Sequence, residues 1–294
     1  DNVPASALNH GAHMGFLRCC MTPWFSSASS FAQKVRTVLS EQPAWILPIM
    51  LLSGANAFYY EVLWTRLINH VLGGSIYAFS TMLASFLSGI AIGGAFAGRF
   101  ARTREQAAWV FAMVQVAIGL CSVAVYAWME HAIPDTRDLV SDALFTAIVM
   151  LPSTVFIGAT LPLAIRILSR DEHDAGTATA RVYSWNTVGA IFGAVFAGFY
   201  LIPLLGFEGS IRLALLINLT LCLWTLITIT PLRLSYVGVV GALILGVVLV
   251  YHPDRPLAVL NASGFASDDD YRDSKEVYFA VGRSATVLMS DKDG

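Results

Sequence analysis

Residues 77–98 read YAFSTMLASFLSGIAIGGAFAG, a run of 22 residues without a charged side chain. The hydrocarbon core of a lipid bilayer is about 30 Å thick, and a helix of about 20 apolar residues is long enough to cross it. This run therefore predicts a transmembrane helix, and the same criterion can be applied outward along the chain in both directions.

Seven stretches meet that criterion, which predicts an all-α integral membrane protein built as a bundle of about seven transmembrane helices. The predicted spans are Trp45–Ile68, Tyr77–Gly98, Ala107–Met129, Leu139–Ile167, Val182–Leu205, Leu213–Thr230 and Ser235–Tyr251. The composition agrees, because 56% of the 294 residues are hydrophobic and only 13% are charged, whereas soluble proteins have about 25% charged residues. The net charge of −2 excludes the basic excess that is typical of nucleic-acid-binding proteins.

The distribution of Lys and Arg predicts the orientation of the bundle, because cytoplasmic loops carry more of these residues. One side would hold ten of them, namely Arg18, Lys34, Arg36, Arg99, Arg102, Arg104, Arg166, Arg170, Arg181 and Arg233. The other side would hold three, namely Arg66, Arg137 and Arg212. We therefore expect a multi-pass protein of the cell's inner (plasma) membrane with a cytoplasmic N-terminus.

Small residues recur every four positions in the second and fifth predicted spans. They are Ser85, Gly89, Gly93 and Ala97 in the second span and Gly189, Gly193 and Ala197 in the fifth. Such faces allow helices to approach closely within a membrane, so we expect the second and fifth spans to pack on each other. The stretches SGIAIGGAFAGRF (88–100) and VGAIFGAVFAGFY (188–200) are also alike, which would fit an inverted repeat of three plus three helices.

Polar residues within the predicted spans are the candidate functional residues, because they are costly in hydrocarbon. Glu61 would be either a proton or cation site, or an interfacial carboxylate paired with Arg66 or another helix. Asn56 and Asn186 would bond neighbouring helices. Pro152 and Pro162 are expected to kink the fourth span, although a proline-broken helix can also build a substrate site.

The four cysteines, Cys19, Cys20, Cys121 and Cys222, lack the spacing of metal or haem ligands, so we expect neither a metal nor a cofactor. Residues 1–43 form a polar N-terminal tail, which we expect to be cytoplasmic and ordered by a protein partner in a membrane complex. The transmembrane domain would cover 44–252, followed by an acidic linker over 253–275. Residues 276–294 alternate as strands and predict a β-hairpin.

Four stretches together resemble the membrane portion of the fused transporter-like/spermidine synthase family, the membrane-bound polyamine aminopropyltransferase-like proteins. They are SGANAFYYEVLWTRLINHVLGGSIYAFSTMLASFLSGIAIGG (53–94), LPSTVFIGATLPLAIRIL (151–168), YSWNTVGAIFGAVFAGFYLIPLLG (183–206) and EVYFAVGRSATVLMSDKDG (276–294). The resemblance implies that residues 276–294 are the first hairpin of a truncated aminopropyltransferase-like domain. The enzyme domain of that family binds decarboxylated S-adenosylmethionine on a Gly-rich loop followed by acidic residues, and this sequence has no such loop. It therefore yields no catalytic or cofactor-binding residue.

Three hypotheses follow for the function. The first, which we favour, is a membrane-embedded anchoring or assembly module of a spermidine synthase-like protein, possibly a subunit of a larger membrane complex, without a catalytic site in this chain. The second is a transporter of polyamines or related small amines. The third is a membrane-bound aminopropyltransferase whose catalytic domain lies outside these residues.

Overall fold

The computed structural model describes residues 43–133, 138–169, 173–229, 250–261, 275–282 and 286–291, together with residues 241, 244, 246 and 248. The chain divides into two compact units, Asp1–Pro43 and Ala44–Gly294. The predicted tail therefore lies outside the described residues apart from Pro43, as do most of the predicted seventh span and most of the acidic linker.

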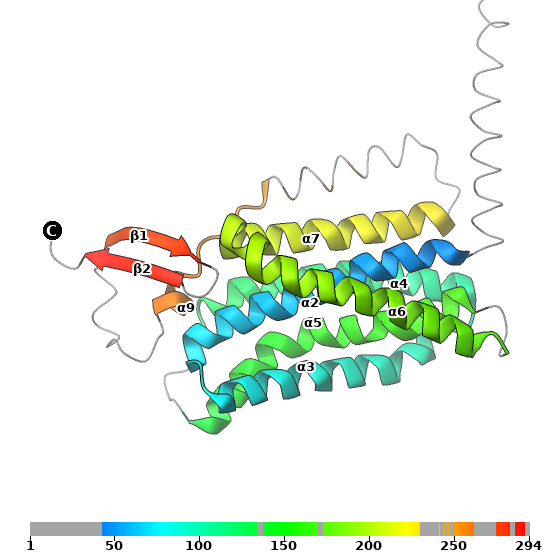
Figure 1. The fold of residues 1–294 in the computed structure, drawn as a ribbon, viewed down its shortest axis with the longest axis horizontal. Coiled ribbons are helices and arrows are strands. Elements are labelled where there is room, and N and C mark those ends of the chain that lie inside the picture. Colours follow the sequence, from blue (N-terminus) through cyan, green and yellow to red (C-terminus); the bar gives the residue numbers. More distant parts are fainter. Residues whose placement is uncertain are drawn as a thin grey trace, which may run out of the picture. The chain divides into compact units, whose positions relative to one another are not determined.

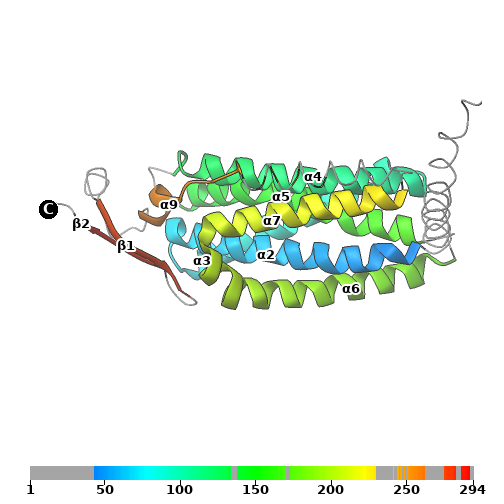
Figure 2. The same cartoon turned by 90° about the horizontal axis from the view of Figure 1, so that it is seen from above.

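Six long helices make up most of the described part of the second unit, and successive helices run in opposite directions (Figure 2). They are α2 (Ile46–Leu72), α3 (Ile76–Ala97), α4 (Arg104–Met129), α5 (Leu139–Leu168), α6 (Ala175–Phe196) and α7 (Ile202–Ile229). Short turns extend them: η1 (Pro43–Trp45) precedes α2, η2 (Gly98–Phe100) follows α3, and the π-helical η3 (Ala197–Leu201) joins α6 to α7.

The first four predicted spans coincide with α2 to α5, but the structure does not show seven spans. By length and composition, five helical segments of the described residues could cross a membrane, and the fifth is a continuous stretch of 55 residues, Ala175–Ile229. A straight helix of that length would extend for about 80 Å. This stretch instead turns at Gly206, where φ is 69°. That left-handed conformation is one that glycine adopts readily. The fifth and sixth predicted spans thus fall in the two arms of one segment, which run in opposite directions (Figure 2).

Side chains in the loops fix where several helices begin. The Ser75 hydroxyl accepts a hydrogen bond from the Ala78 amide at 3.1 Å and caps α3. Thr103 and Gln106 form a capping box at the start of α4, in which each side chain accepts a bond from the other residue's backbone N–H. These bonds satisfy amides that a helix leaves without an intrahelical partner.

Pro152 and Pro162 both lie inside α5, which continues without interruption through them. The alternative of a helix broken at these prolines is therefore not seen, and the expected kink stays a prediction. Thr154, two residues after Pro152, donates its hydroxyl proton to the carbonyl of Met150 at 2.8 Å. This is the bond that Thr commonly makes to the carbonyl four residues earlier in a helix; the carbonyl that Pro152 leaves without its backbone donor is that of Ile148.

The C-terminal part contains the short helix α9 (Leu257–Asn261) and the two strands β1 (Lys275–Val281) and β2 (Thr286–Asp291), drawn in orange and red in Figure 1. The strands pair antiparallel, with Val281 opposite Thr286 and Phe279 opposite Leu288. The predicted hairpin is therefore present in this part of the chain.

Candidate functional site

The six long helices form two repeats of three, α2–α4 and α5–α7. Residues whose numbers differ by 100 occupy equivalent buried positions: Met50 and Met150, Ser53 and Ser153, Ala78 and Ala178, Met82 and Val182, Phe111 and Ile211, and Val125 and Thr225. The packing is equivalent too, because α3 packs on α5 and α6 packs on α2. Helices α2 and α5 run in opposite directions (Figure 2), so the second repeat is inverted relative to the first.

Glycines hold the two repeats together at backbone distance. A Cβ added at Gly89 would lie only 2.7 Å from the Cβ of Thr154 and would overlap that side chain. A Cβ added at Gly93 would overlap the carbonyl of Val155. In the equivalent contact, Gly189 meets the Leu51 carbonyl and Gly193 meets that of Ala55. Both glycine pairs thus lie where another helix passes closely, but the expected partners were wrong.

The second span packs on the fourth, and the fifth packs on the first, rather than the second on the fifth. The other small residues of these faces vary in their burial: Ala97 and Ala197 are buried, whereas Ser85 is half-buried. The spacing of small residues predicts that a face is approached, but it carries no information about which helix approaches it.

Three buried amide side chains lie close to the middle of their helices, and we call Asn56, Gln115 and Asn218 the amide layer. Asn56 donates from Nδ2 to the carbonyl of Ala214 at 3.1 Å, and Asn218 donates from Nδ2 to the hydroxyl of Tyr60 at 2.9 Å. Gln115 donates from Nε2 to the Ser53 hydroxyl at 3.2 Å. The layer therefore connects α2 to both α4 and α7.

Two acceptor atoms of the amide layer are unused. Within the described residues, the Oδ1 of Asn56 and the Oε1 of Gln115 are buried and have no hydrogen-bond partner. An unsatisfied buried polar group costs about 1–3 kcal/mol, so each oxygen is suited to accept a bond from water or from a solute with N–H or O–H groups. The described residues contain no cluster of His, Cys, Asp and Glu that could hold a metal ion.

Sequence reasoning identified Asn56 but missed Gln115 and Asn218, which come from α4 and α7. It also placed Asn56 in one candidate site with Asn186, Glu61 and Arg66, which do not belong to the amide layer. Asn186 lies against Gly54, where an added Cβ would be 2.8 Å from its Oδ1. Glu61 is half-buried, and its Oε2 has no partner among the described residues.

Arg66 lies where the bundle meets the C-terminal segment. Its Nη2 donates to the carbonyl of Gly198 at 2.8 Å, and its Nη1 donates to the carbonyl of Gly282 at 3.0 Å. Gly198 belongs to η3 and Gly282 follows β1 directly. One guanidinium therefore connects α2, η3 and the hairpin.

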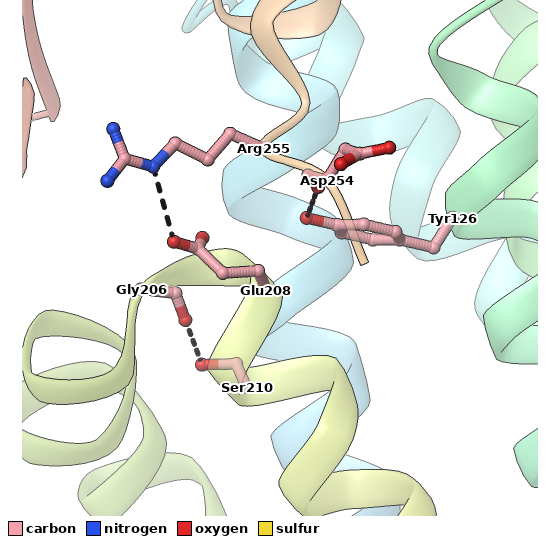
Figure 3. A network of polar contacts seen from close by, with 6 residues as sticks. All are labelled: Tyr126, Gly206, Glu208, Ser210, Asp254 and Arg255. Atoms are coloured by element: carbon pink, nitrogen blue, oxygen red, sulfur yellow. Dashed lines mark hydrogen bonds and ion pairs between the residues drawn. The ribbon is translucent and has the colours of Figure 1, made fainter. Parts of the chain in front are cut away.

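Further contacts hold the C-terminal segment against the same end of the bundle (Figure 3). Arg255 lies 3.6 Å from the carboxylate of Glu208, and its guanidinium stacks over the ring of Phe279 in β1 at 5.1 Å. The Tyr126 hydroxyl donates to the carbonyl of Asp254 at 3.2 Å. In α9, Val259 is fully buried, and this helix packs on α2. The segment after the bundle is therefore packed on the helices through both polar and apolar contacts.

These features define a class of protein: a helical bundle with an inverted repeat, helices of membrane-crossing length, and a docked C-terminal segment. No family model and no solved structure matches the chain. A polyamine aminopropyltransferase of Corynebacterium efficiens is 27% identical to it over 198 residues, which is 63% of this chain and 37% of that protein. Another, from Oceanobacillus iheyensis, is 27% identical over 165 residues, which is 56% of this chain and 31% of that protein.

These similarities support a spermidine synthase-like relationship for the chain; the resemblance to the membrane portion of a fused protein stays a prediction. It spans about a third of the length of these relatives.

Proposed function

We propose that the bundle anchors a spermidine synthase-like protein in the inner membrane and holds its C-terminal part against one end of the helices. Lipid is the natural solvent for its outer surface. The outward faces of α3, α6 and η3 expose large apolar side chains, among them Phe79, Leu87, Phe192, Phe196 and Phe199, and exposed apolar surface on this scale marks contact with a membrane or a partner.

The docked C-terminal segment is the observation that carries the proposal. A flexible tether would leave the part of the protein after the bundle free to move, whereas here Arg66, Arg255 and the buried Val259 fix it to the helices. An aminopropyltransferase-like part that continues from the hairpin would then be held at a defined position next to the membrane.

Hydrogen exchange of the protein in lipid nanodiscs tests this proposal. Phe279 is half-buried and packs against the core, whereas its neighbour Tyr278 is 53% exposed. We expect Phe279→Ala to speed exchange over residues 275–291, because it removes both the apolar contact and the ring beneath Arg255. The matched control Tyr278→Ala should leave exchange unchanged.

Two results would contradict the proposal. One is a hairpin that exchanges as fast in the unaltered protein as in the Phe279→Ala variant. The other is extraction of the chain from cell membranes by alkaline carbonate without detergent, since a bundle that is embedded in the bilayer resists this treatment.

A further inference from the structure

Two arginines occupy equivalent positions in the inverted repeat. Arg66 in α2 and Arg166 in α5 differ by 100 in number, as the equivalent buried residues do. Each belongs to the first helix of its repeat, near the end of that helix. Because the repeats are inverted, the two side chains lie at opposite ends of the bundle.

Each arginine binds the same structural feature of the opposite repeat. Arg66 donates from Nη2 to the carbonyl of Gly198 at 2.8 Å, in η3 between α6 and α7. Arg166 donates from Nη2 to the carbonyl of Arg102 at 2.8 Å, in the turn between α3 and α4. The acceptor of Arg66 lies in the π-helical η3, which joins the second and third helices of its repeat, and the acceptor of Arg166 lies in the loop between η2 and α4, which joins the same two helices of the other repeat.

The two ends differ in what reinforces the arginine. At the Arg166 end, Arg104 donates back across the repeats to the carbonyl of Ser169 at 3.3 Å. At the Arg66 end, the same guanidinium also binds Gly282 next to the hairpin. The Arg66 contact is therefore tied to the position of the C-terminal segment, whereas the Arg166 contact is internal to the bundle.

We propose that Arg66 and Arg166 are equivalent latches, each of which closes one end of the bundle, and that release of one latch opens a path from that end to the amide layer. Between the latches the repeats are joined by the glycine contacts and by the bonds of the amide layer between α2 and α7. A charge-assisted hydrogen bond contributes more than a neutral one, so its loss favours opening at one end only. The unused oxygens of Asn56 and Gln115 give a small N–H or O–H solute its acceptors.

This proposal goes beyond anchoring, since an anchor needs no access to its centre. The two tests alter different residues, since the docking test changes Phe279; Arg66→Gln also removes the bond to Gly282, whereas Arg166→Gln leaves the C-terminal segment untouched. Failure of one proposal therefore leaves the other standing, and the two experiments report on them separately.

Cys222 is a native reporter for the opening. It is buried in α7, one helical turn from Asn218, and it becomes the sole cysteine when Cys19, Cys20 and Cys121 are replaced by Ser. The measurement is the rate at which a small membrane-impermeant thiosulfonate modifies Cys222 in lipid vesicles, with the reagent applied at either end of the bundle.

We expect Arg66→Gln to raise the rate about tenfold or more from the Arg66 end alone, as loss of one charge-assisted bond predicts. Arg166→Gln should raise it from the Arg166 end alone. Arg99→Gln is the matched control, because Arg99 stacks on Phe96 of its own helix, and it should change neither rate.

An equal rise from both ends would overturn the proposal, because it would mean that the variants loosen the bundle generally. Unchanged rates in variants with normal thermal unfolding would overturn it as well. If a Gln variant does not fold, the Lys variant carries the same prediction with a smaller rise. Lysine keeps the charge but lacks the planar guanidinium.

Discussion

Replacement of Gly93 by Ala tests whether the close approach of α3 and α5 stabilises the bundle. The added Cβ would overlap the carbonyl oxygen of Val155 and would lie 2.8 Å from its carbonyl carbon and 3.0 Å from the amide nitrogen of Ala159. All three are backbone atoms of a continuous helix, so no side-chain rotation relieves the overlap. The two helices must move apart.

The neighbouring Gly94 provides a matched control on the same helix. A Cβ there would lie 3.7 Å from the carbonyl of Gly158, which is an ordinary contact, and the equivalent residue of the second repeat is Ala194. Both substitutions gain about 1 kcal/mol of helix propensity, so the difference between them isolates the overlap.

Overpacking costs about 1–3 kcal/mol, and the unyielding backbone favours the upper half of that range. For a domain of this size, about 2–3 kcal/mol corresponds to a difference in Tm of roughly 4–12 °C. We therefore expect Gly93→Ala to unfold well below Gly94→Ala in detergent, followed by tryptophan fluorescence and by loss of the monodisperse peak in size-exclusion chromatography. Equal Tm values for the two variants would refute the packing argument.

Three further predictions address activity, orientation and helix capping. The chain alone, supplied with putrescine and decarboxylated S-adenosylmethionine, should form no spermidine above a no-protein control, and turnover that is lost on replacing Asp269 and Asp270 by Asn would contradict this. A cysteine placed in the 99–104 loop should resist an impermeant reagent in intact cells, and labelling would reverse the predicted orientation. Thr103→Ala should lower the free energy of unfolding by about 1 kcal/mol because it removes the capping box of α4, whereas Thr179→Ala should not, since the Thr179 hydroxyl bonds within its own helix.

The helices were predictable because length and apolarity alone identify a helix that can cross a membrane. The predicted first span, Trp45–Ile68, and the observed α2 differ by only a few residues at their ends. The junction near Gly206 was predicted as a loop between two spans, and only the backbone conformation shows a sharp turn within one helical segment.

Helix partners and the amide layer were not predictable by the same reasoning. Gly89 and Gly189 indicate a close approach, but contact depends on the order of the helices in the bundle, which no local pattern contains. Gln115 and Asn218 were overlooked, although Asn56, which is no more ionisable than they are, was identified. A sequence signal for them does exist: each is an amide close to the middle of a long apolar helix, as Asn56 is.

The two repeats share their packing but not the side chains of the amide layer. Position 56 is Asn and position 156 is Phe, position 115 is Gln and 215 is Leu, and position 218 is Asn while 118 is Ile. The arginines at 66 and 166, by contrast, are the same in both repeats.

Packing therefore does not explain Gln115 and Asn218, because the equivalent Leu215 and Ile118 are apolar and buried in the other repeat. Buried amides with unused oxygens lower stability unless something binds them, so the asymmetric centre and the symmetric ends call for different explanations. Symmetric arginines suit a bundle whose two ends open and close in the same way, and an asymmetric amide layer suits one centre that recognises one kind of solute.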